Sequence, residues 1–250
     1  MMGANLLLPL SGLVLAALAW AAGSVWLAGV TPIAAGFAPL ETARALLALL
    51  QGAELWEHVA VSLERVAVGL GVALLLGIPL GVFTGLSPLF SRSTTPLFQF
   101  ARMISPLSWM PLAVMVLGVG NAPVYFLLAF AAVWPILLNT AAGVAQLDKN
   151  WLLLARSLSA TRRETIVHVI LPGITAQILT GVRLAIGIIW IVLVPAEMLG
   201  VSAGLGYFIL DARDRLAYSD LMAAILVIGF LGYLLDHAAR TLHKRWLHAA

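Results

Sequence analysis

The stretch LLLARSLSATRRETIVHVILPG, from Leu152 to Gly173, interrupts a chain that is otherwise mostly apolar. Charged side chains are rare inside the hydrocarbon of a bilayer, so the stretch is expected to lie outside it. Its own ionisable residues stand directly before another long apolar run: Arg156, Arg162, Arg163, Glu164 and His168. The stretch therefore separates the apolar runs on its two sides into distinct segments.

The composition of the 250-residue chain is that of a membrane protein. Hydrophobic residues make up 62% and charged residues 10% of it, whereas a soluble domain carries about a quarter charged residues. The chain has no cysteine, which excludes a disulfide and a Cys-ligated metal site. We expect no metal and no cofactor in this chain. Its basic residues are scattered between apolar runs, which argues against nucleic-acid binding.

Six apolar runs are long enough to cross a bilayer, since a membrane-spanning helix needs roughly 20 such residues. The predicted fold class is therefore all-α, a polytopic membrane protein with six transmembrane helices. The first run lacks the basic flank of a signal peptide and is expected to be retained. An amphipathic connector over 40–58 follows it. The expected helices cover residues 6–29, 62–86, 96–118, 122–145, 176–199 and 220–241.

Lysine and arginine residues near the helix ends predict the orientation, because cytoplasmic loops carry an excess of them. Four lie toward one side of the predicted membrane: Arg44, Arg65, Arg213 and Arg215. Eight lie toward the other: Arg92, Lys149, Arg156, Arg162, Arg163, Arg240, Lys244 and Arg245. Both termini and the segment 147–171 are therefore expected in the cytoplasm.

Small residues recur at every fourth position along the second expected helix. Residues four apart share one face of a helix, and small side chains there let another helix backbone approach closely. Both static packing and a contact that moves during function fit this pattern. The residues of this small-residue ridge are Gly69, Ala73, Gly77, Gly81 and Gly85.

The charged stretch is predicted to form two short helices joined by an elbow. Asp148 can cap the first helix through its carboxylate, and Thr161 with Glu164 has the spacing of a capping box for the second. Leu171-Pro172 is expected to end the second helix, because a residue before proline is disfavoured in the helical region. Either the spans or the groove of a cytosolic partner can receive the apolar stripe of the first helix: Trp151, Leu154, Ala155 and Leu158.

The same stretch resembles the EAA loop of ABC importer permeases of the binding-protein-dependent type. That pattern is Glu-Ala-Ala, three residues, Gly, nine residues, Ile, one residue and Leu-Pro. Ala155, Val169 and Leu171-Pro172 take matching positions, with Val in place of Ile. Leu153 and Leu154 replace the Glu and the first Ala, and Ser159 replaces the Gly.

Two further stretches resemble permeases for nitrate, taurine, aliphatic sulfonates and related compounds. Residues 102–112, RMISPLSWMPL, are similar to the R-P-x-P-P-L-A-W-L-P-L stretch of that branch, with Met103 and Ser105 replacing prolines. Ala196-Glu197 and the later Gly204-Leu-Gly206 are similar to its A-E and G-L-G elements. The resemblance covers roughly residues 59–246, which we take as the permease core (59–250), preceded by a first helix and connector (1–58).

The resemblance implies a permease subunit that performs no catalysis. The chain has no G-x-x-x-x-G-K-[ST] phosphate loop, so ATP and Mg would be bound by separate cytoplasmic ATPase subunits. The loop 147–172 would contain the coupling helix that docks on them. The docking residues that the resemblance implies are Trp151, Leu154, Ala155, Arg156, Leu158, Ser159, Ala160 and Thr161.

The resemblance also implies a homodimer in the lipid of the bacterial inner membrane, supplied by a periplasmic or lipid-anchored substrate-binding protein. The loops 30–58 and 200–219 are candidates for receiving that protein. Glu197 fits either the pathway or a cap on the 200–206 loop. Arg102 and Arg183 fit either attraction of a small oxyanion or anchoring at lipid headgroups. The pathway candidates are Met103, Ser105, Trp109, Asn139, Trp190 and Glu197.

A secondary transporter or a channel without an ATPase is the alternative reading of six spans. The chain shows no inverted repeat and no array of intramembrane acidic residues for ion coupling. Its histidines form no catalytic constellation with paired carboxylates, which argues against a membrane-embedded enzyme. A channel also gives no reason for a structured elbow between spans.

Overall fold

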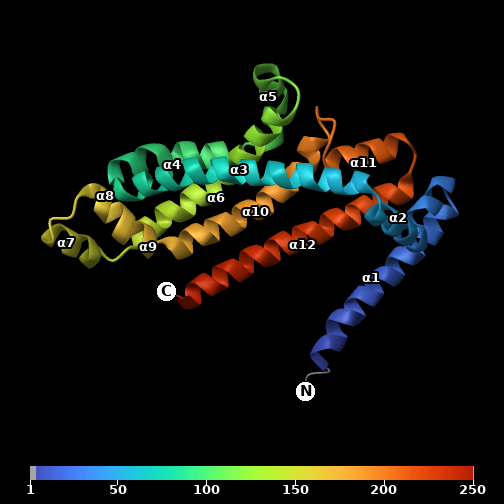
Figure 1. The fold of residues 1–250 in the computed structure, drawn as a ribbon, viewed down its shortest axis with the longest axis horizontal. Helices are drawn as coiled ribbons and strands as arrows, with labels where there is room; N and C mark the ends of the chain where they lie inside the picture. Colours follow the sequence, from blue (N-terminus) through green and yellow to red (C-terminus); the bar gives the residue numbers. More distant parts are fainter. Residues whose placement is uncertain (1–3, 250) are drawn as a thin grey trace. The chain divides into compact units, whose positions relative to one another are not determined.

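The computed structural model describes residues 4–249, and every regular element in that range is helical (Figure 1). Five helices are long and apolar enough to cross a membrane, and a bent helix pair adds a sixth if it counts as one span. The predicted all-α membrane fold is thereby confirmed. Contacts divide the chain into two units: one ends at Ala60 and resumes over Ala203–Phe230, and the other comprises Val61–Ser202 and the chain from Leu231 onward. The functional division at residue 58 stays a prediction.

The first unit joins N-terminal helices to a late segment of the chain. The Trp20 indole donates a hydrogen bond to the Phe37 carbonyl at 2.9 Å, and the Phe37 and Tyr218 rings pack edge to face at 5.4 Å. The expected connector forms one short helix and the start of a long one. The helices of this unit are α1 (Ala4–Ala28), α2 (Pro39–Gln51), α11 (Leu205–Asp214) and the first part of α12 (Tyr218–Ala249), with the 3₁₀ turn η1 (Pro32–Phe37).

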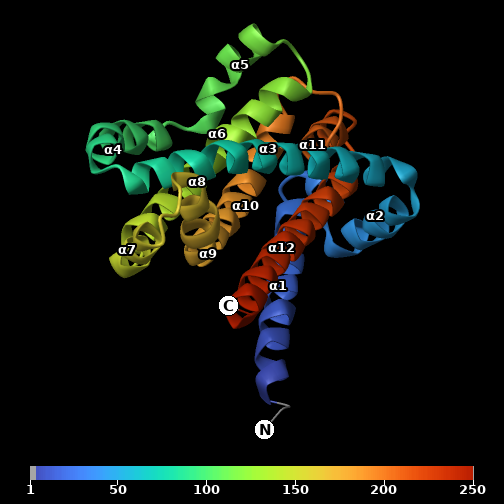
Figure 2. The same cartoon turned by 60° about the vertical axis from the view of Figure 1, so that its left-hand side comes forward.

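The core of the second unit is built by three long helices. These are α3 (Ala53–Leu86), α6 (Asn121–Gln146) and α10 (Thr175–Glu197). α3 crosses in front of the other two in Figure 2. α6 and α10 are in close contact, because a Cβ on Gly181 would lie 2.9 Å from the Pro135 carbonyl oxygen. The core between them is fully buried and apolar: Leu127, Leu128, Ile136, Ile189 and Leu193.

The small-residue ridge of α3 lies against α6. A Cβ added to Gly69 would lie 2.6 Å from the Leu128 Cβ, and one added to Gly81 would lie 2.6 Å from the Thr140 Cβ. Gly85 meets the Val144 Cβ in the same way at 2.5 Å. No side chain fits at these distances, so the spacing of the ridge fixes how closely α3 and α6 approach.

The prediction of one continuous helix over 96–118 is wrong, because the helix is interrupted between Met103 and Pro106. α4 (Pro88–Met103) is followed by a 3₁₀ turn, η2 (Pro106–Trp109), and by α5 (Met110–Leu117), with a bend of 87°. In Figure 2, α5 turns away from the direction of α4. Pro106 has no amide hydrogen and disfavours a helical conformation at Ser105, whose ψ is 127°.

The long helices differ from expectation mainly at their ends. α4 starts eight residues before the expected 96 because Ser87 caps it, accepting a hydrogen bond from the Phe90 amide at 3.3 Å, with proline next in the chain. α3 begins at Ala53 instead of 62. α12 continues beyond the expected end at 241. Polar residues at a helix end do not by themselves stop the helix.

Candidate functional site

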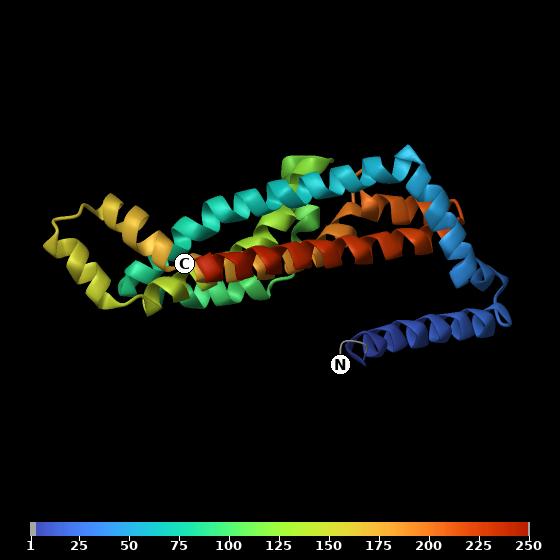
Figure 3. The same ribbon diagram turned by 60° about the horizontal axis from the view of Figure 1, so that its bottom comes forward.

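The coupling segment, residues 148–173, has the predicted form of two helical arms around an elbow (Figure 3). The Asp148 side chain caps the first arm by accepting from the Asn150 amide at 2.9 Å. Thr161 and Glu164 form the capping box, with the Thr161 amide donating to Glu164 Oε2 at 2.8 Å. Both predicted helix starts are confirmed. The arms are α7 (Lys149–Ser157), and α8 (Arg162–Thr165) continued by the π-helical turn η3 (Ile166–Ile170) and α9 (Leu171–Gly173).

Ser159 forms the elbow in a backbone conformation that favours glycine. Its φ is +57°, in the left-handed region that other residues adopt only at a cost. The Ala160 amide bonds the Ala155 carbonyl at 3.0 Å and the Ser159 amide bonds the Arg156 carbonyl at 2.9 Å, which is a Schellman ending of α7. The family pattern has Gly at this position, so the departure at Ser159 keeps the shape of the elbow while adding strain.

The expected stop at Leu171-Pro172 is wrong, since the second arm runs on to Gly173. Leu171 is helical, with φ −57° and ψ −47°, and its amide bonds the Ile166 carbonyl five residues back. This wider π turn accommodates Pro172, which has no amide hydrogen for a regular helical bond. The helical run is interrupted at Ile174 instead, where φ is −111° and ψ is 9°.

The apolar stripe of α7 is mostly exposed in this chain. Trp151, Leu154 and Leu158 are 58%, 52% and 74% exposed, and only Ala155 is buried. Another face of the coupling segment packs on the spans, where Leu152 and Ile166 cover a buried cluster: Val82, Val144, Ile170 and Ile174. The stripe instead lines an open groove of about 420 Å³ together with residues of the second arm: His168, Val169, Pro172 and Gly173.

The other predicted docking residues do not line this groove, and Arg156 and Ala160 border a separate pocket beside Leu152 and Ile166. Arg156, Ser159 and Thr161 are exposed, and Ala160 is half-buried at the elbow. Accepting hydrogen bonds from the Thr161 hydroxyl and amide lowers the pKa of the Glu164 carboxyl. Glu164 therefore stays ionised and keeps its bonds to Thr161 under ordinary conditions. The docking role of these residues stays a prediction.

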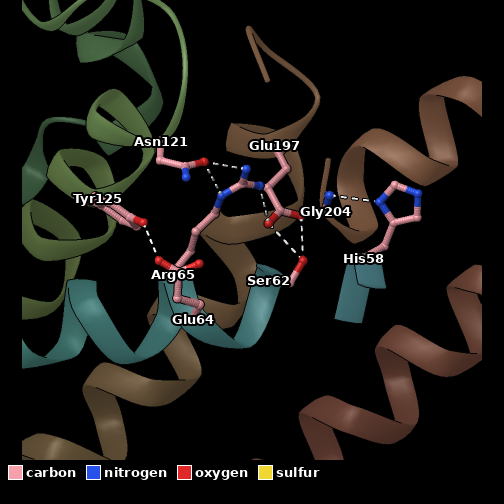
Figure 4. Close-up of polar contacts among 8 residues, drawn as sticks. All are labelled: His58, Ser62, Glu64, Arg65, Asn121, Tyr125, Glu197 and Gly204. Carbon is pink, nitrogen blue, oxygen red and sulfur yellow. Dashed lines mark hydrogen bonds and ion pairs between the residues drawn. The ribbon is translucent and has the colours of Figure 1, made fainter. Parts of the chain in front are cut away.

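A buried polar cluster lies near the start of α3 and at the end of α10 (Figure 4). Arg65 and Glu197 are 2% and 0% exposed, and Arg65 Nη1 lies 2.8 Å from Glu197 Oε1. The Ser62 hydroxyl contacts both Glu197 oxygens, at 2.8 and 2.9 Å. Asn121 Oδ1 accepts from Arg65 Nη2 at 2.7 Å and from Nε at 3.1 Å. The Arg65 guanidinium thus contacts one carboxylate, that of Glu197, and one side-chain amide oxygen, that of Asn121.

Sequence analysis missed Arg65, which it placed among the charges of a loop side. The signal that was available is its spacing, because Arg65 stands four residues before Gly69 and so continues the small-residue ridge. That face of α3 points toward α6. An arginine on a buried face needs a buried partner, and Glu197 was the available carboxylate at the end of α10.

The pathway candidates are scattered in the second unit, and their role stays a prediction. Asn139 lines a cavity of about 340 Å³ beside the break that follows α4. Met103 and Ser105 are exposed at that break, and Trp109 is half-buried with its ring 5.7 Å from Phe130. Trp190 packs elsewhere: a Cβ on Gly232 would lie 2.5 Å from its Nε1.

Several charges singled out from the sequence are paired. Arg183 lies 3.6 Å from Asp236, which also bonds Arg240 at 2.6 Å. In the first unit Arg213 pairs with Asp214 at 2.8 Å and Arg215 with Asp211 at 2.7 Å. Within residues 4–249 no group of three metal-ligating side chains comes together.

The sequence matches, over residues 77–248, the family described as "Binding-protein-dependent transport system inner membrane component". The chain belongs to this family. It is a permease of an ABC importer, as the coupling segment indicated. The orientation of its termini stays a prediction.

Similar proteins support this assignment. The permease is 39% identical over 194 residues to the bicarbonate transport system permease protein CmpB of Synechococcus elongatus, an alignment that covers 77% of this chain and 69% of that one. It is 36% identical to the taurine transport system permease protein TauC of Escherichia coli, covering 77% and 70%. Its fold is similar to a chain of the MetNI methionine ABC transporter, with a TM-score of 0.63, 16% identity, and coverage of 79% and 96%.

Proposed function

We propose that this permease, as a homodimer, forms the membrane pathway of an ATP-driven importer for a small solute that bears an oxyanion group. A periplasmic or lipid-anchored binding protein would deliver the solute, and separate ATPase subunits would bind ATP and Mg. Similar permeases are named for bicarbonate, nitrate, taurine and aliphatic sulfonates. These solutes share a compact oxyanion head, which is the substrate class that we assign.

The exposed groove of the coupling segment is the observation that carries this proposal. Three large apolar side chains, Trp151, Leu154 and Leu158, stand in one row and remain more than half exposed. Apolar rows rimmed by polar residues are typical of protein interaction sites. The exposed His168 supplies a polar edge, so the groove suits a cytosolic subunit that inserts apolar side chains.

The construction of the coupling segment suits the transmission of force. Its two arms are tied by the Schellman ending at Ser159 and by the capping box at Thr161. Ile170 and Ile174 are buried in the core of the second unit, and α10 begins directly after Ile174. A displacement of the groove by closing ATPases would therefore be passed to α10 with little loss in the elbow.

Replacing one exposed side chain of the groove tests the docking. Leu158→Asp places a charge at the centre of an apolar contact, and the ATPase subunit should no longer co-purify with the permease. Val167→Asp is the matched control, because Val167 is also exposed in this segment but does not line the groove. Equal recovery of the ATPase with both variants would refute the assignment of the groove.

Uptake by intact cells tests the transport reaction. A strain that lacks the permease gene should lose uptake of at least one of four labelled solutes: nitrate, bicarbonate, taurine or methanesulfonate. Restoring the gene should restore uptake, whereas the Leu158→Asp form should not. Uptake that continues after ATP depletion, driven by an ion gradient alone, would favour the secondary transporter or channel.

A further inference from the structure

A cavity of about 340 Å³ lies at the break that follows α4. Arg102 in the last turn of α4 lines it, together with Ile104 and Pro106 of the break. α6 and α10 form the remaining walls, mainly with apolar side chains. Figure 2 shows the segment between α4 and α5 beside α6. The cavity is therefore lined by one pathway candidate, Asn139, and lies beside the break that carries two others, Met103 and Ser105.

Arg102 is the one ionisable side chain that lines this cavity. In the part of the chain that the structure describes, it has neither a hydrogen-bond acceptor nor a carboxylate partner, unlike Arg65 and Arg183. Trp134 and Ile188, on other walls, stand near the middle of α6 and α10. The Arg102 side chain is itself exposed, so a ligand in the cavity can reach its guanidinium. The cavity thus carries an uncompensated positive charge.

The polar groups around Arg102 are chiefly hydrogen-bond donors. One amide hydrogen of Asn139 bonds the Pro135 carbonyl at 2.8 Å, which leaves the second amide hydrogen available. Trp134 also lines the cavity, and its indole Nε1 is buried without a hydrogen-bond partner among residues 4–249. Buried indole N–H groups usually find an acceptor. The lining itself contains no carboxylate.

We infer that this cavity is a binding site for a small monovalent oxyanion, and this inference rests on the proposed transport function. The Arg102 guanidinium offers parallel N–H groups that fit two oxygens of a nitrate, bicarbonate or sulfonate group. Asn139 and Trp134 supply the additional donors. The site would hold the oxyanion head while a taurine-like or alkyl remainder lies against the apolar wall of Leu184, Ile188 and Val192.

The charge of the site sets its selectivity. One guanidinium neutralises one negative charge, and the remaining walls are mainly apolar, so a second negative charge would remain uncompensated beside them. Sulfate, a dianion at neutral pH, should therefore bind more weakly than methanesulfonate. Dimethyl sulfone, which has nearly the size of methanesulfonate but no charge, should also bind weakly.

Saturation-transfer NMR on the full-length permease in lipid nanodiscs tests the site, because the methyl protons of methanesulfonate report contact with the protein. We expect transfer to methanesulfonate but not to dimethyl sulfone, and competition by nitrate but not by sulfate. Arg102→Gln should weaken methanesulfonate binding by about tenfold or more, the usual effect of losing a charge-assisted hydrogen bond. Trp134→Phe should weaken it less.

Arg92→Gln is the matched control, since Arg92 is an exposed arginine of the same helix α4 but does not line the cavity. Arg102→Lys keeps the positive charge and should retain part of the binding. If Arg102 had only a structural role, keeping the charge would not restore binding. Equal transfer for wild type, Arg102→Gln and Arg92→Gln, or no transfer for any of them, would overturn the site. Neither result depends on cellular uptake, so loss of the proposed transport function would be seen separately as no uptake of any of the four solutes.

Discussion

The buried polar cluster and the coupling segment are two interruptions of an apolar chain, and they are built in opposite ways. In the cluster, Arg65 and Glu197 turn inward and satisfy each other in the protein interior. In the coupling segment, Arg156 and Arg162 remain outside and large apolar side chains such as Leu158 are exposed as well. One region is complete within the chain, whereas the other exposes a surface that fits a partner.

The difference shows how a membrane protein separates stability from coupling. A buried ion pair whose members bond each other leaves nothing for another protein to bind, and removing one member leaves an uncompensated charge. An exposed apolar row costs the isolated chain hydrophobic free energy that contact with another protein can recover. We therefore expect mutations in the cluster to affect folding and mutations in the groove to affect assembly.

Breaking the buried pair should produce the largest effect. Glu197→Ala leaves the Arg65 guanidinium buried without its carboxylate, and this should destabilise the permease by about 3–5 kcal/mol. Thermal unfolding in detergent, followed by tryptophan fluorescence, measures the loss. Glu64→Gln is the control, because Glu64 is exposed and accepts a hydrogen bond from the Tyr125 hydroxyl at 2.6 Å.

The double variant Arg65→Met/Glu197→Met sharpens this comparison. Replacing both charges with apolar groups of similar length removes the uncompensated charge, so the double variant should be more stable than Glu197→Ala. If the double variant were the less stable of the two, the pair would be needed for more than charge compensation.

A methyl group on the small-residue ridge should have the next largest effect. Gly81→Ala puts a Cβ 2.6 Å from the Thr140 Cβ and 2.7 Å from the Leu137 carbonyl oxygen, so α3 and α6 must separate at a cost of about 1–3 kcal/mol. Gly71→Ala on the same helix meets nothing within 4 Å and should be neutral or slightly stabilising. Similar melting temperatures for the two variants would contradict the observed contact.

Relieving the backbone strain at the elbow should have a smaller effect, and it should stabilise the protein. Ser159→Gly removes the Cβ that disfavours a φ of +57°, and we expect the coupling segment to gain up to about 1 kcal/mol. Ser157→Gly, at the last residue of α7, should instead lose up to about 0.5–1 kcal/mol. Amide hydrogen exchange of residues 149–165 measures both changes locally. Faster exchange in Ser159→Gly would show that the serine stabilises the elbow through contacts.

The smallest expected effect is a pH dependence of the capping box. Because the pKa of Glu164 is lowered in the folded state, its stabilising contribution is complete above the ordinary pKa of a glutamate and is lost as the pH falls through the lowered value. Thr161→Val removes the hydroxyl bond and should raise this pKa toward 4.5. A carboxyl ¹³C titration measures it, with Thr165→Val as a control that should leave the pKa unchanged.

The sequence predicted helices well and their interruptions less well. Apolar runs located α6 and α10 closely because a helix that crosses a membrane needs an apolar composition along its whole length. The break after Met103 was missed, although Pro106 and Pro111 were visible, because a proline within a span can also merely kink a helix. The π turn at Ile166–Ile170 was missed because the residues themselves carry no pattern that distinguishes it from a regular helical turn.

The site was predictable where local chemistry determines it. Asp148 and the pair Thr161–Glu164 cap helices through bonds over two or three residues, and such bonds depend on spacing alone. The partnership of Arg65 with Glu197 joins residues 132 positions apart. No local pattern predicts a contact between residues so far apart in the sequence, although the four-residue spacing from Gly69 does predict the direction in which Arg65 points.

The π turn also fixes an angle. A helix advances about 100° per residue at 3.6 residues per turn, and a π turn is equivalent to one residue inserted into a regular helix. The orientation of the groove about the axis that leads into α10 therefore depends on a single extra residue among Ile166–Ile170. Shortening this turn by one residue would keep every side chain of the groove but rotate the groove by about a quarter of a circle about the helix axis. The number of residues in this turn is therefore itself part of the coupling.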